Sequence, residues 1–232
     1  MSERLEVATA AGLAPFDDAG TPGALDRLLP GAGAWEVELG FGKGRFLLAR
    51  AAAHPEHRFL GIELARDYFR LAADRLARRR LANVVLVRGE ALALLATALP
   101  RGFAAALHVY FPDPWPKSRH QRRRLFSPAS VDLLFGALAP GGELDFATDH
   151  LDYGLEVRRI LAGYPGAQLV ELAGGWPDGA RTNYEAKYVA AGRPILRLAL
   201  RAPEPRGPHP EGLRALTAAV AGPEPSAADS GA

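Results

Sequence analysis

The sequence predicts an α/β fold in which a mostly parallel sheet is covered by helices on both faces. Short apolar runs alternate with longer amphipathic stretches from about residue 34 onward, and several runs are apolar on both faces. Strands that are buried on both sides and alternate with helices are typical of parallel sheets. The last two apolar runs are joined by a long connection without a crossover pattern, which predicts an antiparallel hairpin at one edge of the sheet.

The predicted elements follow in chain order. Strands are expected at residues 35–39, 59–62, 84–87, 104–111, 143–147, 168–172 and 195–200. Helices are expected at residues 45–53, 66–80, 91–99, 127–138 and 153–161, where apolar residues recur at spacings of three and four. Ser127 followed by Pro128 is typical of a helix start, because serine caps the helix and proline fits its first turn.

Length and composition indicate one folded domain, which we expect at residues 21–202 of the 232. Residues 1–20 are predicted to be loose, and residues 203–232, rich in proline and alanine, to be a disordered tail. The sequence has neither a long apolar run nor a signal peptide, so a cytoplasmic protein without a membrane partner is expected. The absence of cysteine excludes disulfides, thiolate metal sites and a cysteine nucleophile, and no metal is expected.

The turn after the first predicted strand places glycine at alternate positions, Gly40, Gly42 and Gly44. This end of a parallel strand is where such folds bind ligands, and glycine lets the backbone turn sharply and approach a ligand closely. Glu38, just before the turn, would repel a pyrophosphate but would attract a cationic amino group, such as that of S-adenosylmethionine. The alternative is a turn with a structural role only.

Two further carboxylates follow the second and third predicted strands. Glu63 can accept hydrogen bonds from both hydroxyls of a ribose, as acidic residues at this position do in nucleotide-binding folds, and NAD would fit this feature too. Glu90 is placed to reach an adenine edge, although a carboxylate favoured by a helix N-terminus is the alternative. Together with Glu38, these residues point to a nucleoside cofactor more specifically than any one of them alone.

The fourth predicted strand leads into a proline-rich loop at residues 111–117, which contains Asp113. Prolines at positions 112, 114 and 116 fix φ and keep the preceding residues extended, so the loop is stiff before any ligand binds. Asp113 is therefore held rigidly at the carboxyl end of a central strand. A simple connector would need neither this carboxylate nor Trp115, so we predict that the loop belongs to the ligand site.

A basic run follows this loop and contains Lys117, Arg122, Arg123 and Arg124, although the net charge of the whole chain is only +2. A cluster of basic side chains beside a balanced domain predicts a surface that contacts the phosphates of a nucleic acid. A solvated helix surface is the alternative.

Taken together, these motifs resemble the bacterial tRNA (guanine-N7-)-methyltransferases over residues 34–201. The loop and basic run at residues 110–125 form the most specific part of the match, and the other matching segments are residues 38–44, 61–63, 147–149 and 182–185. The resemblance implies a class I, Rossmann-like methyltransferase fold with a seven-stranded sheet. It implies S-adenosylmethionine as cofactor and tRNA as partner, with methyl transfer to N7 of guanosine 46 in the variable loop. Monomer and homodimer both stay open.

The resemblance also assigns residues to the site. Its acidic residues, with the three glycines, give a cofactor set of Glu38, Gly40, Gly42, Gly44, Glu63, Glu90 and Asp113, of which Asp113 is also catalytic. The substrate set is Lys117, Asp149, Thr182, Asn183, Tyr184 and Glu185, and Arg122, Arg123 and Arg124 hold phosphates. Glu90 stands where the family usually has aspartate, and Asn183 stands where it usually has lysine.

Guanine N7 carries a lone pair and no proton, so its methylation needs alignment but no general base. Because N7 must stay free for the methyl group, the protein is expected to recognise guanine through its N1 and N2 hydrogens. The candidate acceptors are Asp113, Asp149 and Glu185. Two alternatives remain. A methyltransferase for a small molecule would leave the basic run unexplained, and an RNA-binding protein without activity would not need the acidic residues.

Overall fold

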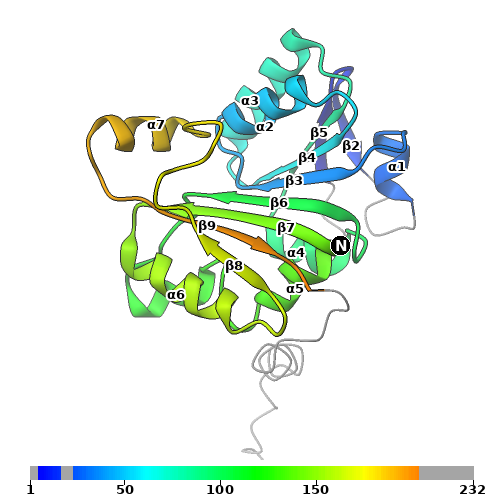
Figure 1. The fold of residues 1–232 in the computed structure, drawn as a ribbon. Coiled ribbons are helices and arrows are strands. Elements are labelled where there is room, and N and C mark those ends of the chain that lie inside the picture. The colour runs from blue at the N-terminus through cyan, green and yellow to red at the C-terminus, as the bar shows by residue number, and fades with distance from the viewer. Residues whose placement is uncertain (1–4, 17–22, 204–232) are drawn as a thin grey trace, which may run out of the picture.

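The computed structural model describes residues 5–16 and 23–203, which form a nine-stranded sheet with helices around it (Figure 1). The central strands are parallel and lie close to their predicted positions. In spatial order they are β5 (Val84–Arg88), β4 (Arg58–Glu63), β3 (Trp35–Leu39), β6 (Ala104–Tyr110) and β7 (Leu138–Thr148). The predicted α/β class is confirmed, and the sheet is mixed, with these five parallel strands at its centre and antiparallel strands at both edges.

The strand order reverses between β3 and β6. From β3 the chain moves outward to β4 and β5, and it then returns past β3 to β6 and β7. Open α/β sheets bind ligands outside the carboxyl ends of the strands at such a reversal, because the two loops that leave it diverge. These loops are the glycine turn after β3 and the proline-rich loop after β6. The fold therefore brings together two motifs that lie far apart in the sequence.

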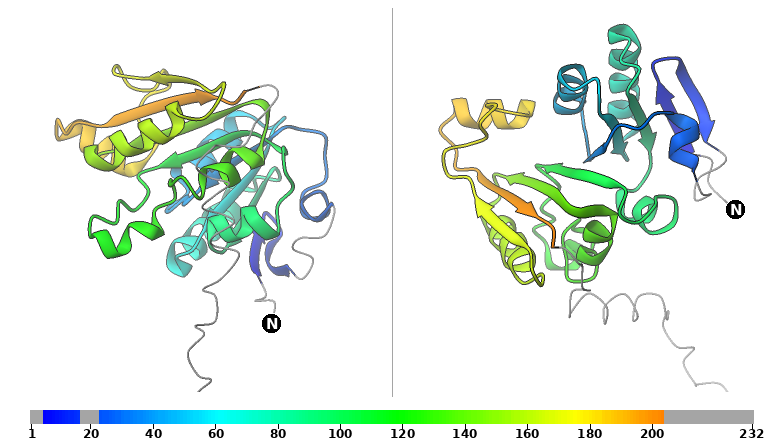
Figure 2. Two further views of the ribbon diagram at one scale, coloured as in Figure 1. Left: turned by 90° about the horizontal axis from the view of Figure 1, so that it is seen from below. Right: turned by 45° about the vertical axis from the view of Figure 1, so that its right-hand side comes forward.

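Helices cover both faces of the sheet (Figures 1 and 2). One face packs against α2 (Arg45–Ala53) and α3 (Arg66–Arg79), and the other against α4 (Ala91–Thr97), α5 (Val131–Ala137) and α6 (Leu151–Ala162). In β5, Val84 and Leu86 join the core with α2 and α3, whereas the alternate side chains of the strand join the opposite core. This alternation follows from the two-residue period of a strand.

The predicted antiparallel edge hairpin is also present. It consists of β8 (Gln168–Glu171) and β9 (Leu196–Arg201), with β9 pairing antiparallel to both β7 and β8. Their connection contains α7 (Asn183–Ala190), a helix that the sequence patterns did not predict. The start of α7 lies beside the start of α2, as shown by the 3.5 Å distance between Arg45 Nη1 and the Thr182 carbonyl oxygen.

The prediction of a loose N-terminal segment is wrong for residues 5–16. These residues form β1 (Leu5–Thr9) and β2 (Gly12–Phe16), an antiparallel hairpin that extends the sheet beyond β5 and gives it nine strands in place of the predicted seven. Arg88 of β5 donates a 2.8 Å hydrogen bond to Glu6, and Val7 and Ala8 are buried. Two short strands of this kind are stable only against an existing sheet edge, which a local pattern does not reveal.

Smaller corrections concern two helices. The helix predicted at residues 127–138 begins at Val131, because the Ser127 carbonyl and hydroxyl oxygens accept the Ser130 amide and form a separate turn before the helix. A short helix, α1 (Ala24–Leu28), was not predicted. The predicted tail lies outside the described residues apart from Pro203. Among the described helices, none is both long and apolar enough to cross a bilayer.

Candidate active site

The glycine turn after β3 has a backbone that only glycine adopts easily. Gly40, Gly42 and Gly44 have φ values of 75°, 52° and 69°, in the left-handed region. A Cβ atom at Gly40 or Gly42 would point into open space, with no atom of the described protein within 4 Å. The turn is held by hydrogen bonds of 2.8 Å from the Gly40 amide to Ile62 and from the Gly44 amide to Phe41. The bare backbone therefore faces the crevice, as a close-fitting ligand requires.

Glu38 lies directly beneath this turn and is almost completely buried. Its Oε2 accepts a 3.2 Å hydrogen bond from the Leu47 amide at the start of α2. Burial raises the pKa of the Glu38 carboxyl to about 8, although the nearby His108 acts in the opposite direction. A buried carboxyl in this state favours a cationic partner, because a positive charge beside it would restore the ionised form.

Glu63, at the end of β4, is joined to the glycine turn. Its Oε2 accepts the Gly42 amide at 2.9 Å, and its Oε1 accepts the Ala65 amide at 2.8 Å. A carboxylate can accept about four hydrogen bonds, so each oxygen keeps capacity for a hydroxyl. Glu63 therefore shapes the turn and remains able to bind a ribose.

Glu90 is the N-cap of α4. Its two oxygens accept the amides of Leu92 and Ala93 at 3.1 and 2.6 Å. The side chain therefore satisfies two amide groups that a helix start leaves unpaired. This is the helix-terminus role that stood as the alternative to the predicted adenine contact, and that contact remains a prediction.

The proline-rich loop after β6 is strained as well as stiff. Phe111 and Trp115 have φ values of 54° and 41°, which non-glycine residues rarely adopt. The Phe111 amide donates a 2.7 Å hydrogen bond to Ala147 of β7, which holds the first of these residues in place. Asp113 lies between them with an exposed side chain that makes no hydrogen bond to the described residues. Strain of this kind persists where the surrounding structure holds a functional loop in place.

The prediction that Arg124 binds phosphate is wrong, because its side chain is buried. Its Nε donates a 2.8 Å hydrogen bond to the Pro114 carbonyl, and its guanidinium forms an ion pair with Glu156 of α6. The same group lies 4.9 Å from the centre of the Tyr153 ring. Arg124 therefore fastens the proline-rich loop to α6.

The other basic residues of this run stay at the surface. Lys117, Arg122 and Arg123 are exposed, and Arg123 stacks on the Trp115 ring at 5.0 Å. They lie in and around the short 3-10 helix Ser118–Arg123, beside Asp113. Their position remains compatible with the predicted contact to phosphates.

The structure divides the predicted substrate segment, residues 182–185, into exposed and buried residues. Asn183 and Tyr184 are exposed, and the Tyr184 ring lies 6.3 Å from that of Phe111 in the strained loop. Thr182 caps α7 by accepting the Glu185 amide at 3.0 Å. Asp149 forms a 3.0 Å ion pair with Arg193 and stays partly exposed.

Glu185 does not have the exposure that its predicted role requires. Its side chain is 1% exposed, forms a 2.6 Å ion pair with Arg197 and accepts the Arg181 amide at 2.8 Å. Both oxygens are therefore engaged within the protein. The prediction that Glu185 reads the guanine edge is wrong for this structure, and its role is to hold the start of α7 against β9.

A buried polar network lies under the site and was not predicted. His108 of β6 lies between two carboxylates, with Nε2 3.1 Å from Glu36 of β3 and Nδ1 3.4 Å from Asp145 of β7. Arg50 also pairs with Glu36, and Arg181 pairs with Asp145. Burial alone would raise the pKa of both carboxyls and lower that of the imidazole. Their mutual hydrogen bonds outweigh it, so the carboxyl pKa values are lowered and the His108 pKa is raised.

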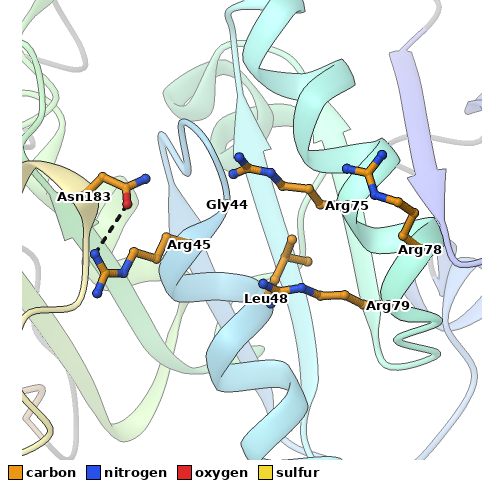
Figure 3. A pocket seen from close by; sticks show the side chains of 7 residues that line it. All are labelled: Gly44, Arg45, Leu48, Arg75, Arg78, Arg79 and Asn183. Atoms are coloured by element: carbon orange, nitrogen blue, oxygen red, sulfur yellow. Dashed lines mark hydrogen bonds between the residues drawn. The ribbon is translucent and has the colours of Figure 1, made fainter.

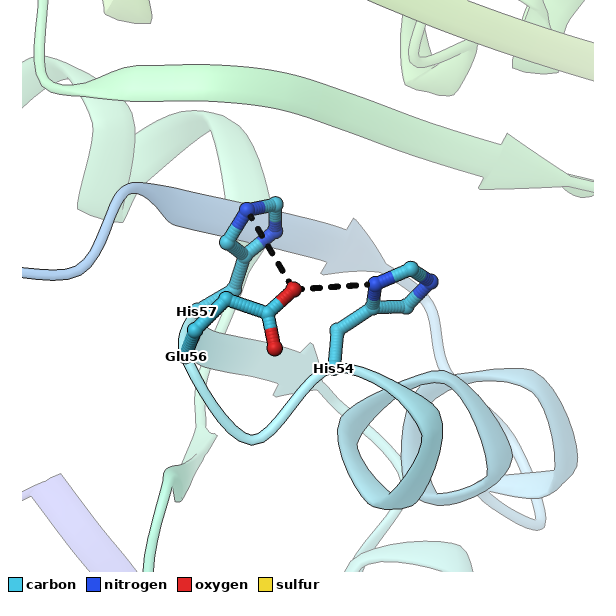
Figure 4. Close-up of side chains that lie close together, drawn as sticks. All are labelled: His54, Glu56 and His57. Atoms are coloured by element: carbon cyan, nitrogen blue, oxygen red, sulfur yellow. Dashed lines mark hydrogen bonds and ion pairs between the residues drawn. The ribbon is translucent and has the colours of Figure 1, made fainter.

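One group of potential metal ligands occurs within the described ranges, formed by His54, Glu56 and His57 (Figure 4). It lies between α2 and β4, at the opposite end of the strands from the glycine turn. His57 Nδ1 is 2.7 Å from Glu36, and Arg50 is 3.4 Å from the His54 ring. The group therefore adjoins the buried network and is separate from the active site.

Comparisons with known proteins agree with this geometry. A family model described as "Putative methyltransferase" matches residues 33–198. The tRNA (guanine-N(7)-)-methyltransferase of Anaeromyxobacter dehalogenans is 41% identical over 174 residues, which cover 72% of this chain and 85% of that protein. The enzyme of the same name from Alkalilimnicola ehrlichii is 35% identical over 195 residues, which cover 82% of this chain and 81% of that protein.

Solved structures share the fold at lower sequence identity. The 16S rRNA methyltransferase KamB superimposes with a TM-score of 0.59 and 14% identity, covering 84% of this chain and 97% of that one. A 16S rRNA (adenine(1408)-N(1))-methyltransferase from Catenulisporales acidiphilia, solved with its cosubstrate S-adenosylmethionine, gives a TM-score of 0.56 at 20% identity, covering 88% of this chain and 99% of that one. The fold is thus that of the class I methyltransferases. From the family match and the level of identity to these relatives, the chain belongs to the tRNA (guanine-N(7)-)-methyltransferase family.

Proposed function

We propose that this protein transfers the methyl group of S-adenosylmethionine to N7 of a guanosine in tRNA, at position 46 of the variable loop, and that it acts in the cytoplasm. The activity and the cofactor follow from membership of the family. One observation of the structure supports the proposal most strongly. A bare glycine backbone and a rigid loop carrying an exposed carboxylate meet where the strand order reverses.

The residues around the glycine turn fit the cofactor. S-adenosylmethionine, when bound, supplies an electrophilic methyl group on a cationic sulfur. Glu63 is placed to accept the ribose hydroxyls, and Glu38 to accept the ammonium group of the methionine part. The missing Cβ atoms at Gly40 and Gly42 leave room for the ligand to contact the backbone.

The protein contributes alignment and charge, because guanine N7 has no proton to lose. Holding donor and acceptor in line supplies roughly 7 to 11 kcal/mol of rate acceleration in favourable cases. Asp113 is held between two strained residues at the edge of the crevice, where its negative charge offsets the positive charge that develops on the guanine ring. It acts as a positioning and charge-stabilising group in contact with the base.

Base recognition is divided between carboxylates and an aromatic surface. Asp113 remains available to accept the guanine N1 and N2 hydrogens, and so does the Asp149 oxygen that does not pair with Arg193, whereas Glu185 is buried. Tyr184 and Phe111 offer ring faces beside Asp113, and stacking on an aromatic ring is worth about 1 to 3 kcal/mol per base. A guanine in an RNA loop, already free of a helix stack, suits such a site.

The role of Asp113 can be tested with Asp113→Ala and the control Asp152→Ala, which removes an exposed carboxylate from the first turn of α6. We expect Asp113→Ala to lose methyl transfer to unmodified tRNA by at least about 100-fold, with its unfolding curve unchanged. The control should keep wild-type activity. Wild-type turnover of Asp113→Ala would remove Asp113 from the reaction.

A further inference from the structure

A cavity of about 430 Å³ between α2 and α3 is lined mainly by arginine (Figure 3). Arg45 comes from α2, and Arg75, Arg78 and Arg79 come from α3, with Asn183 of α7 at the rim. Cavities for small molecules are lined predominantly by apolar and aromatic side chains. Four arginines in the lining of one cavity favour an anion instead.

The positive charge of this cavity is not neutralised by the described part of the chain. None of the four arginines forms an ion pair there, whereas Arg50, Arg124 and Arg197 each pair with a glutamate. Guanidinium groups that lie together without ion pairs repel one another, and a bound phosphate would relieve this repulsion through paired N–H···O hydrogen bonds.

The cavity adjoins both halves of the active site. Arg75 Nη1 donates a 2.7 Å hydrogen bond to the Lys43 carbonyl in the glycine turn. Arg45 Nη1 lies 3.4 Å from Asn183 Oδ1 at the start of α7. An anion held in this cavity would therefore lie close to both the cofactor turn and the substrate segment.

We propose that this arginine cavity binds the phosphodiester backbone of the RNA substrate, as a second phosphate site separate from the basic run. The proposal rests on the proposed function, since it takes tRNA as the substrate. The basic run is fastened to α6, which packs on the opposite face of the sheet from α2 and α3. Phosphate contacts on both sides of the crevice orient the RNA so that one base enters between them, because such contacts position a nucleic acid without reading its sequence.

The test uses Arg78→Ala/Arg79→Ala, which removes two exposed charges from the last turn of α3 and leaves Arg45 and Arg75 in place. The control is Arg158→Ala/Arg159→Ala, an adjacent exposed pair on α6 in which Arg158 forms a 3.1 Å ion pair with Glu171. The affinity for tRNA is measured at several salt concentrations, alongside binding of S-adenosylmethionine, binding of inorganic phosphate and thermal unfolding.

We expect the α3 variant to bind tRNA about tenfold or more weakly, with a salt slope lower by about one to two. Binding of S-adenosylmethionine should be unchanged. Arg78→Lys/Arg79→Lys keeps the charge at the helix C-terminus and should retain most of the salt slope. If millimolar inorganic phosphate binds to the wild-type cavity but the α3 variant has the same affinity for tRNA as the wild type, the cavity takes a free anion. That result would overturn the proposal.

An unchanged salt slope in the α3 variant would also overturn it, as would an equal loss in the α6 control, which would indicate diffuse attraction. Failure of the proposed function gives a different result, because the wild-type protein would then not methylate tRNA. Wild-type methylation together with wild-type binding by the α3 variant would contradict only the second phosphate site.

Discussion

Arg124 and Arg122 are close neighbours in one basic run, but the structure predicts different effects for their replacement by methionine. Arg124→Met should lower stability, and Arg122→Met should weaken the salt dependence of tRNA binding. Arg124→Met removes the hydrogen bond to Pro114 and the ion pair with Glu156, while keeping much of the packing on Tyr153. A hydrogen bond to a charged group is worth about 1.5 to 3 kcal/mol, and breaking a buried ion pair costs about 3 to 5 kcal/mol. Glu156 is 35% exposed and regains water, so we expect a loss of about 2 to 4 kcal/mol in unfolding free energy.

The same change should release the strained loop. Trp115 stores about 1 to 3 kcal/mol of backbone strain, which the loop loses once Arg124 no longer holds the Pro114 and Trp115 carbonyls. A shift of about 1 Å at Asp113 would lower methyl transfer about 100-fold at saturating tRNA. Arg122→Met should leave unfolding within about 0.5 kcal/mol of wild type and reduce the salt slope of tRNA binding by about one.

Urea denaturation, single-turnover methyl transfer and tRNA binding at several salt concentrations measure these effects. If Arg124→Met unfolds like the wild type and lowers the salt slope as Arg122→Met does, Arg124 contacts phosphate, and the structural role assigned to it is wrong.

Two further variants test buried carboxyls. Burial raises the pKa of native Glu38 to about 8, whereas an ordinary glutamate has a pKa of 4.5. Between these two pH values the native state binds more protons than the unfolded state. The free energy of unfolding therefore falls as the pH rises from 4.5 to 8. Glu38→Gln should remove this fall, on the order of 4 kcal/mol, and equal falls between pH 5 and 8 in urea denaturation of both proteins would contradict it. Glu185→Gln leaves Arg197 buried without its partner and should lower unfolding free energy by about 3 kcal/mol; a loss no larger than that of the exposed Asn183→Ala would show that this pair is not structural.

Local patterns predicted the parts of the fold whose signals are local. The central strands are apolar on both faces, and the helices between them repeat at three and four residues, so both appear in short windows of sequence. The hairpin at residues 5–16 was missed because its stability comes from pairing with β5, which is remote in the chain. The helix α7 was missed because its sequence, Asn183–Ala190, carries a motif of polar and aromatic residues in place of an apolar stripe.

The candidate site shows the same division. The glycine turn and the proline-rich loop could be found from residue type alone, since φ preferences are local properties. Whether Arg122 or Arg124 is exposed depends on how the segment after the 3-10 helix packs against α6, where Arg124 pairs with Glu156. No charge pattern contains that information. The pairing of His108 with Glu36 and Asp145 likewise requires the register of three strands. Charged residues inside predicted buried strands were the one available signal for this network.

The identity of the methylated atom tests the central claim most directly. Wild-type protein is incubated with labelled S-adenosylmethionine and either an unmodified tRNA transcript or the same transcript made with 7-deazaguanosine, in which a C–H group replaces N7. We expect 7-methylguanosine as the product from the first transcript, at position 46, and no methyl transfer to the second. Another methylated nucleoside, or equal transfer to both transcripts, would contradict N7 methylation by this site.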